Sequence, residues 1–189
     1  MLKTSFLQRK KDILSKIDKS SKGDWDKHIL KLCEKINSKE DFYTTSSCSG
    51  RIVLMKDSEI KKHGLFLKVD HNKISFNLLI KDLKEIVGKN KNLIMFKQES
   101  CILHVACSSL ENAQKLYDKA KLAGWKKSGI ISSGKRFIVE LNSTEKLEFP
   151  IADRGKELVD EKFLKMIVKE ANRKLKKGWE KIRRLEKII

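Results

Sequence analysis

Hydrophobic residues recur at three- and four-residue spacing in five stretches of the chain, and this period predicts helices. The last and longest stretch begins at Asp160 and carries one apolar stripe to Ile189, while lysine and arginine crowd its other faces. Ser75 can cap the third helix, and Ser108 or Ser109 can cap the fourth. The predicted helices cover residues 6–17, 25–36, 76–87, 110–120 and 160–189.

Runs of β-branched and aromatic residues between these helices predict strands. The segment Phe42–Leu54 contains two such runs around a small polar stretch, which predicts a hairpin. Strands follow one another in runs, so the pattern favours an α+β fold with a mixed or mainly antiparallel sheet flanked by helices. A chain of 189 residues is long enough for one well-buried core, and we expect a single domain, residues 1–189. The other predicted strands are 64–69, 93–96, 101–107, 128–131, 136–141 and 147–150.

The polar stretch inside the predicted hairpin is the most distinctive chemistry of the chain. Four consecutive small side chains, Ser46–Ser49, precede Gly50 and Arg51. Small side chains let a ligand approach the backbone, hydroxyl and N–H groups can surround an anion, and the planar guanidinium of Arg51 matches a carboxylate or phosphate. The stretch indicates either a site for a polar ligand or an ordinary serine-rich turn.

Standard catalytic signatures are mostly missing from the sequence. There is no Gly-x-Gly and no phosphate-binding Gly-x-x-x-x-Gly-Lys-Ser/Thr motif, which disfavours a Rossmann-type fold and the other familiar nucleotide-binding folds. His104 is a candidate acid–base residue in a predicted strand, although a lone strand histidine is often structural. Cys48 could act as a nucleophile beside Ser47 and Arg51. The four cysteines show no Cys-x-x-Cys spacing, so the sequence supports neither a zinc site nor a disulfide scaffold.

The charge of the chain predicts a polyanionic partner. The chain has 43 lysines and arginines and 25 acidic residues, which gives a formal net charge of +18. Such an excess of positive charge usually indicates binding to nucleic acid. A biased genome composition or a thermophilic source is the alternative explanation. No apolar run approaches the roughly 18 residues of a membrane span, and basic residues interrupt the N-terminal apolar positions, so we expect a soluble, cytoplasmic protein.

Five motifs follow one another along the chain: Phe42–Ile52, Ile102–Cys107, Ala123–Ile130, Ser143–Pro150 and Ala171–Lys174. In this order they resemble one protein family, the tRNA wybutosine-synthesising protein of the third step, and the similarity is to its archaeal, single-domain type. The sequence departs from the family pattern at Gln98–Cys101, where an aromatic-Pro-Phe segment is common, and at Phe66, where a tryptophan can occur.

The resemblance implies a methyltransferase that uses S-adenosylmethionine and acts on phenylalanine tRNA. Its target would be the N(4) ring nitrogen of 7-aminocarboxypropyl-demethylwyosine at position 37, its fold would not be the usual methyltransferase fold, and no metal would be needed. His104 would accept the proton lost from that nitrogen, and Trp125 would stack on a base or make a helix-end hydrophobic contact. The residues assigned to the cofactor or to the substrate carboxylate are Ser46, Ser47, Cys48, Ser49, Gly50 and Arg51. Those assigned to tRNA phosphates are Lys135, Arg136, Arg173 and Lys174.

Two alternatives belong to other classes of protein. A non-catalytic RNA-binding module explains the charge but gives the Ser46–Arg51 stretch no purpose, and it would not respond to the cofactor. A cysteine-dependent hydrolase explains Cys48 and His104, and it predicts that Cys48→Ser is inactive. The methyltransferase hypothesis instead predicts a modest loss for Cys48→Ser and a severe loss for Arg51→Ala.

Overall fold

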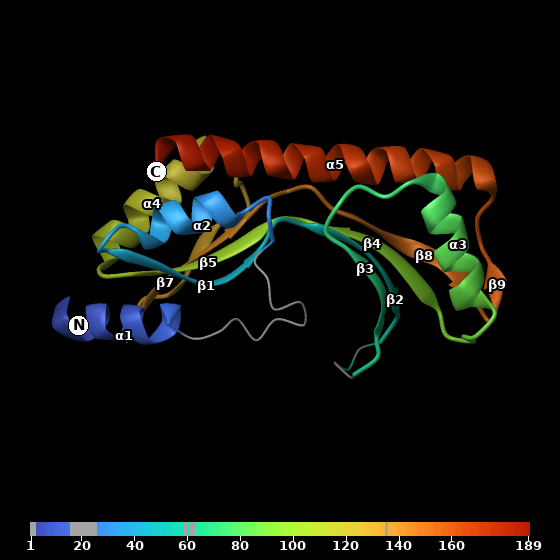
Figure 1. Cartoon of the computed structure of the whole chain (residues 1–189), viewed down its shortest axis with the longest axis horizontal. Coiled ribbons are helices and arrows are strands. Elements are labelled where there is room, and N and C mark those ends of the chain that lie inside the picture. The colour runs from blue at the N-terminus through green and yellow to red at the C-terminus, as the bar shows by residue number, and fades with distance from the viewer. Residues whose placement is uncertain (1–2, 16–25, 59, 61–62, 135) are drawn as a thin grey trace. The chain divides into compact units, whose positions relative to one another are not determined.

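The computed structural model describes residues 3–15, 26–58, 60, 63–134 and 136–189 (Figure 1). The chain divides into two compact units. Unit 1 consists of residues 1–49, 101–144 and 178–189, and unit 2 consists of residues 50–100 and 145–177. The prediction of a single domain stays a prediction. The end of the first predicted helix, the start of the second at Trp25, and Lys135 lie outside the described residues.

Unit 1 is built on a four-stranded antiparallel sheet with the order β1-β5-β7-β6. Helix α1 lies on one side of this sheet, and helices α2 and α4 lie on the other (Figure 1). The Ser109 hydroxyl accepts a hydrogen bond from the Asn112 N–H, which confirms one of the two predicted caps of α4. The elements are α1 (Lys3–Leu14), α2 (Leu30–Asn37), β1 (Phe42–Cys48), β5 (Ile102–Cys107), α4 (Leu110–Leu122), β6 (Gly129–Ser132) and β7 (Phe137–Asn142).

The two faces of this sheet differ in what covers them. Val105, Val139 and Leu141 point to the α2 and α4 side and are completely buried. On the other side, Tyr43 and Ala106 pack against Phe6 of α1, with the Phe6 and Tyr43 ring centroids 5.2 Å apart. Helix α1 therefore covers the part of this face near the start of β1.

Unit 2 is built on a five-stranded antiparallel sheet with the order β3-β2-β4-β8-β9. Ser75 caps α3 by accepting a hydrogen bond from the Leu78 N–H, as predicted. The Asn172 side chain binds both the N–H and the carbonyl of Ile74, at 3.0 and 2.8 Å, and so ties the loop before α3 to α5. The elements are β2 (Arg51–Lys56), β3 (Phe66–Asp70), α3 (Phe76–Val87), β4 (Ile94–Glu99), β8 (Leu147–Asp153), β9 (Lys156–Glu157) and α5 (Glu161–Ile188), whose last turns belong to unit 1.

The predicted α+β fold with mainly antiparallel strands and a long C-terminal helix is confirmed. The strands form two sheets instead of one. The predicted hairpin Phe42–Leu54 is wrong, because β1 pairs with β5 whereas β2 pairs with β3 and β4. The reason is that Ser46–Cys48, expected in the turn, continue the ladder of β1 opposite β5 and leave only Ser49 and Gly50 between the strands. None of the described helices is long and apolar enough to span a membrane.

Candidate functional site

The predicted ligand-binding stretch follows a β-bulge in β1. The register of β1 against β5 shifts at Thr45, whose hydroxyl lies 3.4 Å from the His104 carbonyl oxygen. Bulges bend a strand and re-aim its side chains, and they are common beside functional sites. After the bulge Ser46 is exposed and Ser49 is 1% exposed. Ser46–Ser49 belong to unit 1, and the chain enters unit 2 at Gly50.

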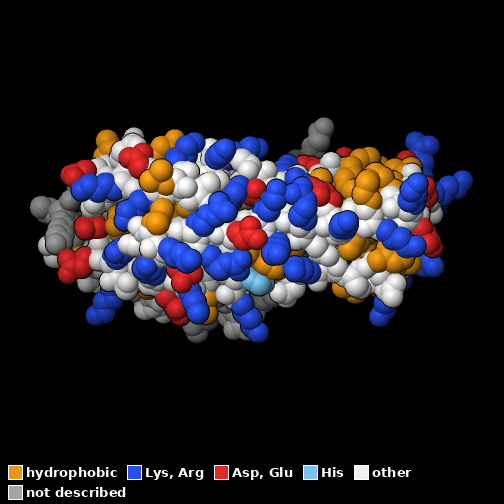
Figure 2. Space-filling model, turned by 90° about the horizontal axis from the view of Figure 1, so that it is seen from above, with side chains coloured by type: hydrophobic (Ala, Val, Ile, Leu, Met, Phe, Trp, Pro, Cys, Tyr) orange, Lys and Arg blue, Asp and Glu red, His pale blue; other side chains and the backbone are white. Residues whose placement is uncertain are grey.

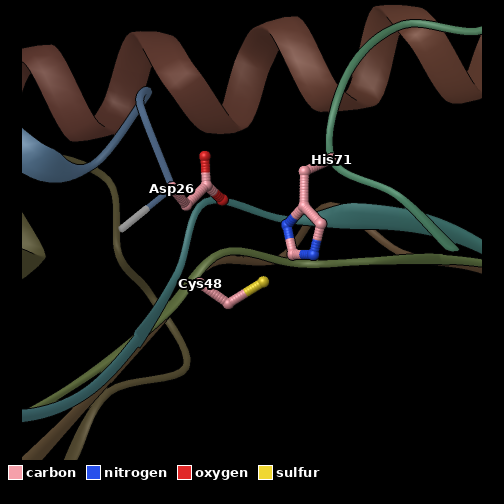
Figure 3. Close-up of side chains that lie close together, drawn as sticks. All are labelled: Asp26, Cys48 and His71. Atoms are coloured by element: carbon pink, nitrogen blue, oxygen red, sulfur yellow. The ribbon is translucent and has the colours of Figure 1, made fainter. Parts of the chain in front are cut away.

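A carboxylate from the segment before α2 fixes the end of this stretch. One oxygen of Asp26 accepts a hydrogen bond from the buried Ser49 N–H at 2.8 Å, and the other accepts one from the His28 N–H at 3.3 Å. An Asp26 oxygen also lies within 4.8 Å of Cys48 Sγ (Figure 3). The Ser49 hydroxyl is buried and has no hydrogen-bond partner among the described residues. Buried polar groups nearly always have a hydrogen-bond partner, so this hydroxyl lacks a partner that a ligand could supply.

Arg51 is held in place by two neighbours in unit 2. It lies opposite Glu99 in the β2–β4 ladder, and its Nε donates a hydrogen bond to Glu99 Oε2 at 2.5 Å. Its guanidinium carbon lies 4.9 Å from the centroid of the Phe66 ring, a cation–π contact. Glu99 uses the Nε donor, and none of the described residues accepts a hydrogen bond from the terminal nitrogens of this half-buried guanidinium, which suit a carboxylate or phosphate.

His104 forms a polar row with two residues on neighbouring strands. It lies between Ser46 of β1 and Glu140 of β7, directly opposite both in the antiparallel ladders. Residues paired in this way point to the same face of a sheet. His104 Nε2 and Glu140 Oε2 are 2.8 Å apart, and both side chains are about a third exposed, 29% and 31%. The structure therefore brings Ser46 and His104 together, as a site that uses both requires.

Trp125 does not offer a surface for base stacking. Its side chain is 0% exposed, and its indole N–H donates to the Lys181 carbonyl at 3.2 Å. The stacking prediction is wrong because both ring faces are covered by protein, and the alternative, a hydrophobic contact at the end of α4, is what the structure shows.

Of the predicted phosphate contacts that the structure describes, Arg136 and Arg173 are exposed and Lys174 is half-buried. Arg136 is exposed next to β7. Arg173 is exposed on α5 and pairs with Glu170, its Nε donating at 2.7 Å, and Lys174 lies 3.9 Å from the same carboxylate. Figure 2 shows lysine and arginine side chains spread along the face of the molecule that carries α5. This basic surface is suited to an RNA backbone, whose phosphates bind such side chains.

The buried cysteines are structural. Burial raises the pKa of the Cys33 thiol to about 12, and burial likewise raises the pKa of the Cys107 thiol to about 12. Both thiols are therefore protonated at neutral pH, and both side chains belong to the core. Cys48 is half-buried at the end of β1.

Three acidic residues of these sites were not predicted from the sequence. They are Asp26, Glu99 and Glu140. A signal was present for Glu140, because this charged residue stands between Val139 and Leu141 in the middle of a predicted strand. A charged residue in such a position usually has a partner or a function.

The chain belongs to a methyltransferase family, since a family model described as Methyltransferase TYW3 matches residues 8–189. A relative from Thermococcus sibiricus, named tRNA(Phe) 7-((3-amino-3-carboxypropyl)-4-demethylwyosine(37)-N(4))-methyltransferase, is 37% identical over 97% of this chain and 93% of its own length. A Methanocaldococcus jannaschii protein of the same name is 37% identical over 93% of this chain and 92% of its own. The solved structure of the PH1069 protein from Pyrococcus horikoshii superposes with a TM-score of 0.88 at 35% identity, covering 98% of this chain and 94% of that one. The resemblance inferred from the motifs is confirmed.

Proposed function

We propose that this protein transfers a methyl group from S-adenosylmethionine to the N(4) ring nitrogen of 7-aminocarboxypropyl-demethylwyosine at position 37 of phenylalanine tRNA. The observation that carries the proposal is the family match over residues 8–189, which includes the whole Ser46–Arg51 stretch. Membership of a methyltransferase family also argues against the two alternatives, the non-catalytic RNA-binding module and the cysteine-dependent hydrolase.

The residues of the stretch fit the polar end of S-adenosylmethionine. The Ser49 hydroxyl is a buried donor without a protein partner in the described part of the chain, and Gly50 has a φ of 94°, a conformation that side chains disfavour. The terminal nitrogens of Arg51 match a carboxylate, either that of the cofactor or that of the substrate's aminocarboxypropyl group. When bound, S-adenosylmethionine supplies a methyl group on a sulfonium sulfur.

The side chains then have three tasks. Ser46, Ser49 and Arg51 bind and orient the polar groups, because methyl transfer requires the attacking nitrogen, the methyl carbon and the leaving sulfur to be in line. His104 takes the proton that the ring nitrogen loses. Arg136 and the basic surface of α5 bind tRNA phosphates, so the affinity for tRNA falls as the salt concentration rises.

Calorimetric titration with S-adenosylmethionine tests the proposal. The unmodified protein should bind it saturably, and Arg51→Ala should lose at least tenfold in affinity, since a charge-assisted hydrogen bond contributes roughly 1.5–3 kcal/mol. Arg154→Ala is a matched control, because the Arg154 side chain is 90% exposed and pairs only loosely with Asp153 at 3.7 Å. It should bind like the unmodified protein.

The second arm is methyl transfer to phenylalanine tRNA that carries the demethylwyosine precursor, read by mass spectrometry of the nucleoside. The expected product is the precursor plus one methyl group. Absence of cofactor binding both with and without this tRNA would refute the proposal. Binding of the cofactor without methylation of this precursor would be consistent with a methyltransferase but would refute the proposed substrate.

A further inference from the structure

We propose that Glu140 is a positioning residue that holds the imidazole of His104 with its proton on Nε2, so that Nδ1 is the atom that accepts the proton of the methylated nitrogen. This inference rests on the proposed function, because it assigns the base of that reaction to one atom. It begins with the contact between His104 Nε2 and Glu140 Oε2, 2.8 Å long, across neighbouring strands.

The chemistry of the two groups decides which nitrogen carries the proton. An ionised carboxylate has no hydrogen to donate, so a hydrogen bond at 2.8 Å requires the proton to be on Nε2. In a neutral imidazole the other nitrogen, Nδ1, then has a free lone pair and is the acceptor. The register of β5 and β7 therefore selects the tautomer.

The surroundings of the pair keep it in one arrangement. On one side the next cross-strand row is the apolar row of Tyr43, Ala106 and Ile138, where Ala106 and Tyr43 pack against Phe6. On the other side lies the row of Cys48, Ile102 and Asn142. Ser46 and Gly129 lie at the two ends of the His104–Glu140 row itself. The pair is thus bounded along the sheet but remains partly exposed for a substrate.

The described strands place two other titratable side chains on this face. They are Tyr43 and Cys48. Arg9 of α1 and Arg136 lie close enough to Tyr43 to lower its pKa, although burial has the larger, opposite effect and raises it. Glu140 is therefore the acidic group that the ladder places directly opposite His104.

The proton balance of the reaction gives this pair a task. The ring nitrogen forms a bond to the methyl carbon, the carbon–sulfur bond breaks, and its electron pair stays on sulfur. The proton of the nitrogen passes to Nδ1 of His104, which becomes an imidazolium. The Glu140 carboxylate stabilises that cation through the hydrogen bond already present at Nε2.

The first test is nitrogen NMR of the His104 ring in the protein alone, without cofactor or tRNA. At a pH where the ring is neutral, we expect the form with the proton on Nε2 to predominate in the unmodified protein. Glu140→Ala should give a mixture of the two tautomers. Glu140→Gln retains a carbonyl oxygen of the same reach as an acceptor and should keep part of the preference.

The second test is the single-turnover rate of methyl transfer. General-base catalysis is worth about 10²- to 10⁴-fold, and a residue that only orients the base should account for part of it, about 10- to 100-fold in Glu140→Ala. Glu140→Gln should fall between the unmodified protein and Glu140→Ala. The affinities for S-adenosylmethionine and tRNA should stay within twofold. Glu111→Ala is the matched control in the same unit, since Glu111 is exposed on α4 and pairs with Lys115 at 2.7 Å.

The outcomes separate this inference from the proposed function. An unchanged tautomer in Glu140→Ala, or a rate no lower than that of Glu111→Ala, overturns the role of Glu140. A His104→Ala variant with full activity overturns the role of Nδ1. If the unmodified protein transfers no methyl group while the NMR result is as expected, the proposed function fails, and the tautomer selection by Glu140 still stands.

Discussion

Replacing Trp125 with phenylalanine separates a structural role for this residue from a role in binding RNA. The side chain is completely buried, and its N–H donates to the Lys181 carbonyl at 3.2 Å. Phenylalanine keeps an aromatic ring but loses this hydrogen bond, at a cost of about 1 kcal/mol, and leaves part of the indole volume unfilled, at a further cost of about 1–3 kcal/mol. We therefore expect the free energy of unfolding to fall by about 2–4 kcal/mol.

The assay is urea unfolding of Trp125→Phe, together with its tRNA affinity at a temperature where the variant is folded. The dissociation constant for tRNA should stay within about twofold. A stacked base would contribute about 1–3 kcal/mol, which is roughly a 5- to 150-fold weaker dissociation constant when it is lost. Leu122→Ala is the control, because Leu122 is 83% exposed at the end of α4, just before Trp125, and its replacement should cost less than about 0.5 kcal/mol. A large loss of affinity with unchanged stability would refute the reasoning.

Three further predictions follow from the described side chains. Hydrogen bonds from Lys146 and Lys97 hold the pKa of Glu148 below its ordinary value of 4.5. The unmodified protein should therefore be more stable than Glu148→Gln at neutral pH, and this difference should disappear as the pH falls from about 4.5 through the lowered pKa. Urea unfolding of both proteins across this pH range measures the difference. Alkylation at pH 8 followed by mass spectrometry should modify the half-buried Cys48 well before Cys33, whose pKa of about 12 and burial protect it; equal rates would contradict this. Arg173→Ala should weaken tRNA binding and reduce the slope of log affinity against log salt by about 1, whereas an unchanged slope would remove Arg173 from the RNA contacts.

Features that depend on neighbours in the chain could be predicted from the sequence. Ser75 caps α3 through an N–H three residues away, and the strands predicted at 128–131 and 136–141 are observed as β6 and β7, which pair with each other. The prediction of a turn at Ser46–Ser49 also used only neighbouring residues, and it was wrong. The small polar residues of this stretch resemble a turn, yet Ser46–Cys48 pair with β5, a partner more than 50 residues further along the chain. Composition shows that a segment is polar, but whether the chain reverses there depends on which strand is available to pair with it.

In the candidate site, too, some residues could be recognised from the sequence and others could not. Arg51 and His104 could be recognised from the sequence, because a guanidinium after four small residues and an imidazole inside a strand are unusual by their own chemistry. Their partners could not be recognised, since Glu99 lies 48 residues from Arg51 and Glu140 lies 36 residues from His104. Each partner is fixed by the register of one antiparallel ladder, and a register shift of one residue would turn the carboxylate to the opposite face of its sheet. In each pair the reactive group therefore depends for its orientation on strand pairing, and the apolar residues that set the register, such as Val105 opposite Val139, contribute to the site without touching it.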